Sequence, residues 1–537
     1  MENEALKFII NYENAVKELS KRSALAYFNA SISGKSEDYQ RASELQLQLE
    51  KIHADKKEFE KVVRFKNSDK IQDSIIKRQI DLIYNSYAGS QIEESLLEEI
   101  INLSTKIEQT FSTYRAEING KKFTDNEIDE ILKKSKDSNE LKAAWEASKN
   151  IGQIVAGDVI KLVKLRNKAA RQLGFDNFHT MSLSLNEQSV GEIDSIFESL
   201  DNFIKKPFAK LKDEIDIVLA EEYGIKKENL MPWHYQDKFF QQGPSIYKVD
   251  LDKYFKEQDI PQLTKEYYKS IGLDVDNLFA KSDLFEKEGK YQHAYCTHID
   301  REGDVRVVCN IKPTQQWMST MLHEFGHAAY DKYISDKLPW TLRQPAHIFT
   351  TEAIAMLFGR MATNAEWLKD VMKISNVEKV KINENCNNAL RLEQLVFSRW
   401  VQVVYNFEKE LYDNPEQDLN SLWWQLVKKY QLINKPGNRN SADWAAKIHI
   451  TLYPAYYHNY MLGELLASQL YFFIKNKVLA TESKSVSFFE KEDVGKYLIN
   501  LFMSYGSLYR WDKLIKTATG EKLNPKYFAE QFVNDNG

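Results

Sequence analysis

The segment HEFGH, residues 323–327, carries two histidines four positions apart in a chain that has only 10 histidines among 537 residues. Side chains four apart share one face of a helix, so His323 and His327 can each direct a ring nitrogen at the same Zn²⁺. Glu324 is rotated from His323 by about 100°, so it can take the proton of a water at the metal without binding the metal. This H-E-x-x-H pattern predicts zinc-dependent hydrolysis. The alternative is a helix with two structural histidines.

A catalytic zinc needs a third protein ligand and an open position for water. Glu352 lies 25 residues after His327, in the apolar helical pattern TTEAIAMLFGRMA, where a carboxylate is costly unless it is paired or metal-bound. We expect Glu352 to be the third ligand; the alternative is a buried salt bridge with Arg360 or Arg343. This set would hold one zinc ion per chain. Zinc lowers the pKa of a bound water to about 7, and Glu324 would act as general base.

Strand and turn signals predict the elements that position this motif. The segment VRVVCNI (305–311) is rich in β-branched residues, and it follows the turn-like DREGD (300–304) and the segment HAYCTHI (293–299). This order predicts a β-hairpin. Pro313 suits the first turn of a helix, and we expect that helix to carry the motif and to end near Ile334.

Helical signals dominate the rest of the chain. An amphipathic stripe covers residues 71–84, and Thr124 with Glu127 and Ser189 with Glu192 have the spacing of capping boxes. The first 130 or so residues are predicted to form several charged, amphipathic helices. We find no short-period repeat, low-complexity segment or Gly/Ser- or Pro-rich linker. One large helical body with subdomains is therefore favoured over several separate domains.

Composition excludes several classes of protein. The formal charge is −5, from 73 basic and 78 acidic residues, so nothing indicates a nucleic-acid partner. No stretch approaches 18 apolar residues, so no membrane span is expected. Three cysteines argue against a disulfide framework. Because the N-terminal sequence also lacks a signal-peptide pattern, we expect a cytoplasmic location.

Three segments resemble the angiotensin-converting enzyme family of zinc peptidyl-dipeptidases, which is related to the thimet oligopeptidase family. The first is HAYCTHIDREGDVRVVCNI leading into HEFGH, and the second is RQPAHIFTTEAI. The third is WWQLVKKYQ followed by DWAAKIHI and PAYYHNY. Together they cover about 170 residues, 291–460. The resemblance supports the zinc ligands and the base named above.

The resemblance implies roles for two further catalytic residues. His449, in KIHI, matches the family histidine that stabilises the transition state, whereas a lone histidine in an apolar run is usually structural. Tyr460 matches the tyrosine that donates to the scissile carbonyl or oxyanion.

Four residues match family positions that bind substrate. His293 and Ala294 match an edge strand that holds the substrate backbone, in agreement with the predicted hairpin. Lys447 matches the lysine that holds the C-terminal carboxylate of the substrate, although a solvated lysine is the alternative. Tyr457 matches a tyrosine that helps to anchor this carboxylate; one extra residue in this chain leaves Tyr456 as a competitor.

Two positions depart from the animal enzymes of the family. Asn459 stands where they have a chloride-binding arginine, so we expect no chloride activation of that type. Met356 stands where they have an acidic residue close to the metal ligands, so another group must orient the zinc-binding histidines.

The resemblance implies a mainly α-helical metallopeptidase with two subdomains around a deep channel and a small β-hairpin beside the active site. We expect a single unit over 1–537, with lid-like helices in 1–130, the hairpin and zinc-binding helices in 291–360, and a substrate-binding and transition-state segment in 420–475. The expected activity is release of C-terminal dipeptides from oligopeptides. The alternatives are an oligoendopeptidase that does not need the free C-terminus and an inactive helical peptide-binding protein.

Overall fold

The computed structural model describes residues 1–533, and helices make up most of it. The helices are α1 (Glu2–Ser33), α2 (Ser36–His53), α3 (Lys56–Lys66), α4 (Ser74–Ala88), α5 (Glu94–Thr113), α6 (Asp125–Lys134), α7 (Ser138–Gln172), α8 (Phe178–Leu185), α9 (Val190–Tyr223), α10 (Ile260–Ser270), α11 (Asp276–Phe279), α12 (Gln315–Lys332), α13 (Ile348–Gly359), α14 (Ala365–Met372), α15 (Asn376–Asp413), α16 (Leu419–Gln431), α17 (Ile448–Leu452), α18 (His458–Phe473), α19 (Glu492–Leu501), α20 (Trp511–Thr519) and α21 (Lys526–Phe532). The strands are β1 (Ala116–Ile118), β2 (Lys121–Phe123), β3 (Tyr295–His298) and β4 (Val305–Val308). The prediction of a mainly α-helical fold with a small sheet is confirmed.

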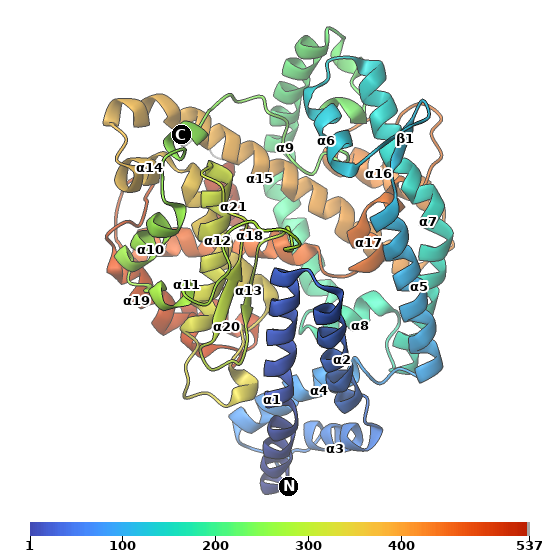
Figure 1. Cartoon of the computed structure of the whole chain (residues 1–537), viewed down its shortest axis with the longest axis vertical. Coiled ribbons are helices and arrows are strands. Elements are labelled where there is room, and N and C mark those ends of the chain that lie inside the picture. Colours follow the sequence, from blue (N-terminus) through green and yellow to red (C-terminus); the bar gives the residue numbers. More distant parts are fainter. Residues whose placement is uncertain (534–537) are drawn as a thin grey trace.

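The helices form two groups joined by the long helix α15 (Figure 1). This helix packs against α14 and α18 in one group and against α7 and α16 in the other. One hydrophobic cluster extends through both groups, from Leu103 to Phe532. None of the helices in the described part of the chain is both long enough and apolar enough to cross a membrane.

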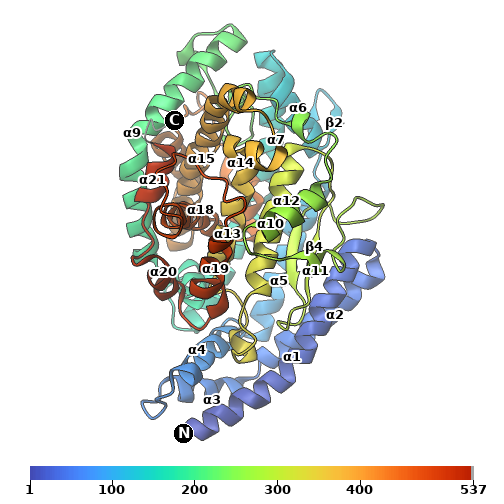
Figure 2. The same ribbon diagram turned by 90° about the vertical axis from the view of Figure 1, so that its left-hand side faces the viewer.

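The N-terminal helices α1 to α4 form a separate layer at one end of the molecule (Figures 1 and 2). They have their own small hydrophobic cluster, which runs from Ala5 to Tyr87. Phe28 of α1 packs against Val308 in β4 and against Ile299, which directly follows β3. This layer therefore covers the sheet that leads to the H-E-x-x-H helix. Its function as a lid stays a prediction, as does the division of the chain into the segments named above.

The predicted hairpin is confirmed, with shorter strands than expected. β3 and β4 pair antiparallel, with Tyr295 opposite Val308 and His298 opposite Val305. The opposite side of β4 bridges to Asp283, so β3 is the edge strand of this small sheet. His293 and Ala294 precede β3 instead of lying within it.

The first 130 or so residues form several helices, as predicted, but a hairpin that was not predicted, β1–β2, lies between α5 and α6. Its two-residue loop is Asn119–Gly120, and both residues have positive φ, 51° and 78°. Asn-Gly is the preferred pair for such a turn because these residues tolerate left-handed backbone conformations. The Asn-Gly pair in the sequence indicates such a turn, but the charged residues on both sides of it do not resemble typical strands.

Helix α12 carries the H-E-x-x-H motif and begins after Pro313, not at it. Thr314 is the N-cap, and its side chain accepts a hydrogen bond from the Trp317 backbone N–H. The capping threonine satisfies a donor that the first helical turn leaves free. The capping box of Thr124 and Glu127 is also confirmed at the start of α6. By contrast, α4 begins at Ser74, three residues after the predicted start, because Asp73 caps it.

Helix α13 lies between α12 and α18, and glycines allow both close approaches. A Cβ atom on Gly326 of α12 would lie 2.7 Å from the Cα of Ala355, inside the α13 backbone. On the other side, a Cβ on Gly463 of α18 would lie 3.0 Å from the Cβ of Glu352 and 3.0 Å from the Met356 sulfur. Because real Cβ atoms need more room than this, the two glycines set the spacing of the three helices.

The first prediction concerns the α12–α13 contact. Gly326→Ala should lower the free energy of unfolding by about 1–3 kcal/mol, because the added methyl forces the two helices apart. It should also weaken zinc binding, since His327 and Glu352 lie on the separated helices. Thermal unfolding and chelator competition would measure these two effects.

Gly157→Ala is the matched control. Gly157 also lies inside a helix, α7, but no atom is within 4 Å of the position of an added Cβ. This variant should be neutral or more stable by up to about 1 kcal/mol, because alanine favours the helix over glycine. Equal behaviour of the two variants would contradict the spacing argument.

Candidate metal centre and active site

Two histidines and one glutamate converge on one point between α12 and α13. The Nε2 atoms of His323 and His327 lie 3.6 Å and 3.8 Å from the Glu352 Oε2 atom. One ligand atom from each of the three residues lies within 4.8 Å of the others. The structure thus brings together the three residues that the sequence predicted as metal ligands.

No lysine or arginine in the described part of the chain pairs with this carboxylate. Arg360 pairs with Glu464, and Arg343 pairs with Glu302 at 3.5 Å. The salt-bridge alternative for Glu352 is therefore not realised in the structure. Burial raises the pKa of Glu352 to about 7, and burial lowers the pKa of His323 to about 4.

These features fit a zinc ion. Neutral imidazole nitrogens and a carboxylate oxygen are ligands that zinc accepts, and the low pKa of His323 keeps its ring neutral without a metal. A buried carboxylate without a protein cation is costly, and a divalent ion would remove that cost. Three protein ligands leave a coordination position for water or substrate, as in catalytic zinc sites.

The threonine that precedes the glutamate ligand orients one of the histidines. The Nδ1 atom of His327 lies 2.7 Å from the Oγ1 atom of Thr351. With a metal ion on Nε2, Nδ1 would carry the proton and donate it to this hydroxyl. Because Met356 stands where the animal enzymes have an acidic residue, another group must orient the histidines. For His327 that group is Thr351.

Glu324 lies beside this centre, with only 7% of its surface exposed. Burial and the nearby charge of Glu352 raise the pKa of Glu324 to about 8. A carboxylate with a raised pKa is a stronger base, and a base whose pKa is near neutral suits general acid–base catalysis.

A cavity of about 590 Å³ opens beside the three ligands, between β3, α12, α13 and the start of α18. Six residues from the predicted active site line it, namely Ala294, His323, Glu324, His327, Glu352 and Tyr460. His293, Lys447, His449 and Tyr457 do not line it, and His293 is exposed. Tyr456 does line it.

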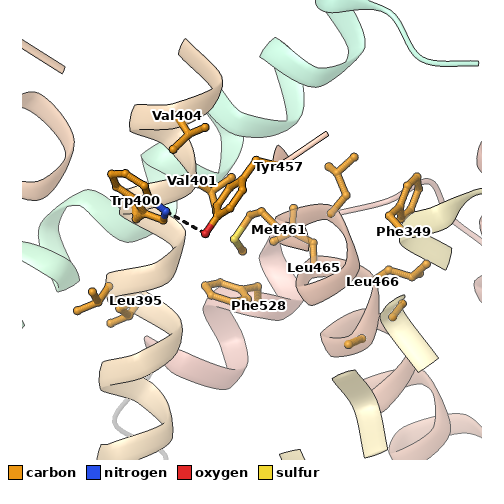
Figure 3. Close-up of a cluster of buried hydrophobic side chains, with 14 of the residues drawn as sticks. Phe349, Leu395, Trp400, Val401, Val404, Tyr457, Met461, Leu465, Leu466 and Phe528 are labelled. Carbon is orange, nitrogen blue, oxygen red and sulfur yellow. Dashed lines mark hydrogen bonds between the residues drawn. The ribbon is translucent and has the colours of Figure 1, made fainter. Parts of the chain in front are cut away.

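Two of the other residues, His449 and Tyr457, are linked to the cavity by packed aromatic rings. The centroid of the His449 ring lies 5.0 Å from that of Tyr457, and the Tyr457 centroid lies 5.4 Å from that of Tyr460. The Tyr457 hydroxyl accepts a 3.0 Å hydrogen bond from Trp400 Nε1 within a buried cluster (Figure 3). Tyr457 does not line the cavity, whereas Tyr456 lines it and packs against Tyr460 with 5.5 Å between the ring centroids.

Lys447 lies in an aromatic pocket formed by Phe239, Trp400 and Tyr457. Its ammonium is 5.3 Å from the Tyr457 ring centroid and 5.5 Å from that of Trp400. It donates a 2.6 Å hydrogen bond to the Oε1 atom of Gln241. The sequence argument named Lys447 but missed Gln241, which lies 206 positions away and is brought there only by the fold.

Unlike a surface lysine, Lys447 is 9% exposed, and burial lowers its pKa to about 8. His449 is also unusual, because its Nδ1 atom is buried and has no hydrogen-bond partner among the described residues. Burial lowers the pKa of His449 to about 4, so its ring is neutral at pH 7.

Comparison with known proteins agrees with this site. A family model described as "Angiotensin-converting enzyme" matches residues 1–532. The chain belongs to the angiotensin-converting enzyme family. The predicted resemblance is thus confirmed over nearly the whole chain, and members of this family are zinc metallopeptidases.

Relatives of this family member are only distantly similar to it. The angiotensin-converting enzyme of Theromyzon tessulatum is 23% identical over 495 residues, which are 84% of this chain and 79% of the relative. Carboxypeptidase 1 of Bacillus subtilis (strain 168) is 24% identical over 312 residues, 53% of this chain and 59% of the relative. The inactive angiotensin-converting enzyme-related protein of Caenorhabditis elegans is 22% identical over 374 residues, 60% of this chain and 40% of the relative.

The second prediction concerns Thr351. Thr351→Val keeps the shape of the side chain but removes the oxygen that accepts from His327, so zinc affinity should fall about 10–100-fold. Competition with a chromophoric chelator would measure the dissociation constant. Thr351→Ser should restore most of the affinity.

Thr517→Val serves as the control, because Thr517 is an exposed helical threonine in α20 whose hydroxyl donates only to a backbone carbonyl of its own helix. It should bind zinc as the wild type does. Wild-type affinity in Thr351→Val would show that the hydroxyl does not orient the ligand.

Proposed function

We propose that this family member removes dipeptides from the free C-termini of oligopeptides. The observation that carries the proposal is the buried ammonium of Lys447, which lies beside the Tyr457 ring, and that ring packs against Tyr460 in the cavity wall. An ammonium has three N–H donors, and Gln241 occupies one of them. The remaining donors can bind the terminal carboxylate of a peptide whose second-last peptide bond lies at the metal.

In this proposal His323, His327 and Glu352 hold a zinc ion. Zinc, when bound, polarises the scissile carbonyl and increases the acidity of the attacking water. Glu324 accepts the proton of that water as its oxygen bonds to the carbonyl carbon, then delivers the proton to the leaving nitrogen as the C–N bond breaks. The raised pKa of Glu324, about 8, supports both proton transfers near neutral pH.

The negative charge that develops on the carbonyl oxygen needs donors close to it. We assign this role to Tyr460, which lines the cavity, and to His449, which is linked to it through Tyr457. His449 is neutral and retains a ring N–H for donation.

An extended substrate can also bind through its backbone. β3 is an edge strand, and Ala294 just before it lines the cavity. Edge strands bind extended peptides through main-chain hydrogen bonds. His293 would extend this contact at the cavity mouth, since it is exposed there. We also propose a cytoplasmic location, which the three free cysteines support.

The third prediction tests the position of cleavage. A decapeptide with a free C-terminus should release dipeptides in steps, and its C-terminal amide should be cleaved poorly, because only the carboxylate can bind Lys447. Mass spectrometry of the products would give the cleavage sites. Lys447→Gln should lower kcat/KM for the free peptide roughly tenfold or more, since a charge-assisted hydrogen bond is lost.

Two control variants accompany this experiment. Lys435→Gln, at an exposed lysine, should leave kcat/KM unchanged. Glu324→Gln should abolish turnover if Glu324 is the base. Equal internal cleavage of the free and amidated peptides would instead identify an oligoendopeptidase.

The fourth prediction concerns pH. Burial lowers the pKa of Lys447 to about 8, so the free enzyme loses this positive charge as the pH rises above 8. For the free-acid peptide, kcat/KM should therefore fall about tenfold per pH unit above that point. The amidated peptide should lack this decrease, and Lys447→Arg should move it to higher pH. The same profile for both peptides would mean that another group titrates.

A further inference from the structure

The end of the cavity beyond His327 contains a second set of charged side chains. Asp331 follows His327 by one helical turn on α12, and Arg301 lies in the loop of the β3–β4 hairpin. Both line the same cavity as the metal ligands, together with His298 of β3. The mechanism proposed above does not use any of these three residues.

Asp331 is an enclosed carboxylate without a bonded partner. Its side chain is 14% exposed, and it makes no hydrogen bond within the described part of the chain. The nearest ring nitrogen is His298 Nδ1, which lies 3.9 Å away. The other nitrogen, Nε2, accepts from the Gly303 backbone N–H, so Nδ1 carries the proton and points toward the carboxylate at a distance too long for a hydrogen bond.

Other groups only partly compensate this charge. Burial lowers the pKa of His298 to about 4, so its ring is neutral. Arg301 stacks on the Trp340 ring, with its guanidinium carbon 4.5 Å from the ring centroid, and forms no ion pair within 4.0 Å with any described carboxylate. Arg343, the other cation in the cavity wall, is already bonded to the Leu338 carbonyl and paired with Glu302.

A buried carboxylate that none of the donors in the cavity wall reaches has a free-energy cost that a bound ligand can remove. The uncompensated group here is an acceptor, so the matching ligand is a donor with a positive charge. The face of the Trp340 ring partly compensates the positive charge of Arg301. The N–H groups of Arg301 can still donate to a carbonyl oxygen of the ligand, next to the positive group that Asp331 would bind.

The position of Asp331 relative to the metal indicates which part of a peptide would reach it. If Lys447 holds the C-terminus, the residues before the scissile bond extend to the other side of the metal. One helical turn advances about 5.4 Å, and two extended residues span about 6.6 Å. The second residue before the scissile bond therefore comes next to Asp331.

We propose that Asp331, with Arg301 beside it, forms a subsite for a primary ammonium group carried by the second residue before the scissile bond. This inference rests on the proposed direction of peptide binding. Two sources have this chemistry, namely the α-ammonium of a tetrapeptide and the side chain of a lysine in a longer peptide. Arg301 would bind the adjacent carbonyl oxygen of the substrate.

Three peptides of sequence X-Ala-Phe-Leu distinguish the two sources. X is norleucine with a free N-terminus, norleucine with an acetylated N-terminus, or lysine with an acetylated N-terminus. Their dissociation constants would be measured by calorimetry on zinc-loaded Glu324→Gln protein, so that binding is determined without turnover. At least one of the two peptides that carry an ammonium group should bind at least about tenfold more tightly than the acetylated norleucine peptide.

Adding Asp331→Asn to the Glu324→Gln protein should abolish the tighter binding of the peptide that carries the ammonium group. The amide keeps the shape of the side chain but has no charge. Adding Asp331→Glu should retain part of this tighter binding. The matched control is Asp336→Asn, since Asp336 is exposed and its carboxylate makes no hydrogen bond in the described structure. It should leave the ratio of dissociation constants unchanged.

The outcomes are distinct. Tighter binding of the free norleucine peptide alone identifies the N-terminus as the ligand, and tighter binding of the lysine peptide alone identifies the side chain. Equal binding of all three peptides, or a preference that survives Asp331→Asn, overturns the inference. Wild-type enzyme incubated with the same peptides tests the proposed function separately, since release of Phe-Leu from all three at equal rates would leave that function intact.

Discussion

Two buried carboxylates lie close together in this protein, and no lysine or arginine of residues 1–533 pairs with either of them. Glu324 and Glu352 are 7% and 8% exposed, and burial raises the pKa of each. The arginines that could have paired with Glu352 are bound to other acids. The site is thus electrostatically incomplete until a divalent cation binds between the histidines and Glu352. Burial also makes Glu324 more basic than an exposed glutamate.

The rest of the fold holds this arrangement in place. α12 carries His323, Glu324 and His327, and α13 carries Glu352. Tyr456, just before α18, and Tyr460, within it, line the cavity. The hairpin covers the opening with an edge strand, and α1 packs on that hairpin. The rings of Trp400 and Tyr457 lie beside the Lys447 ammonium, and burial lowers the pKa of Lys447 to about 8.

The local features were predictable from sequence because they depend on spacing along one element. The pairing of His323 with His327 follows from helical geometry, and the β3–β4 hairpin follows from β-branched residues around a turn. Glu352 could be assigned because a carboxylate in an apolar helix needs a partner. Similarly, the capping box at Thr124 fixed the start of α6.

Features that depend on tertiary packing could not be predicted in this way. Gln241 meets Lys447 across 206 positions, and no local pattern marks it. The hydroxyl of Thr351 gains its function only when α13 packs against α12. Asp331 resembled an ordinary polar residue late in a helix, because nothing in the sequence shows that its side chain lies in a cavity. The Asn119–Gly120 turn was a missed local signal instead, hidden by charged neighbours.

The glycines on both sides of α13 restrict which amino-acid substitutions this protein can accept during evolution. Gly326 closes against Ala355 from one side, and Gly463 closes against Glu352 and Met356 from the other. A larger side chain on either face would push α13 toward the opposite glycine, where there is no room to move. Single steps that enlarge these positions are therefore blocked, and the three helices can diverge only through compensating pairs of substitutions. The ligand geometry would then outlast most of the surrounding sequence, as expected for a chain that shares under a quarter of its residues with the Theromyzon enzyme.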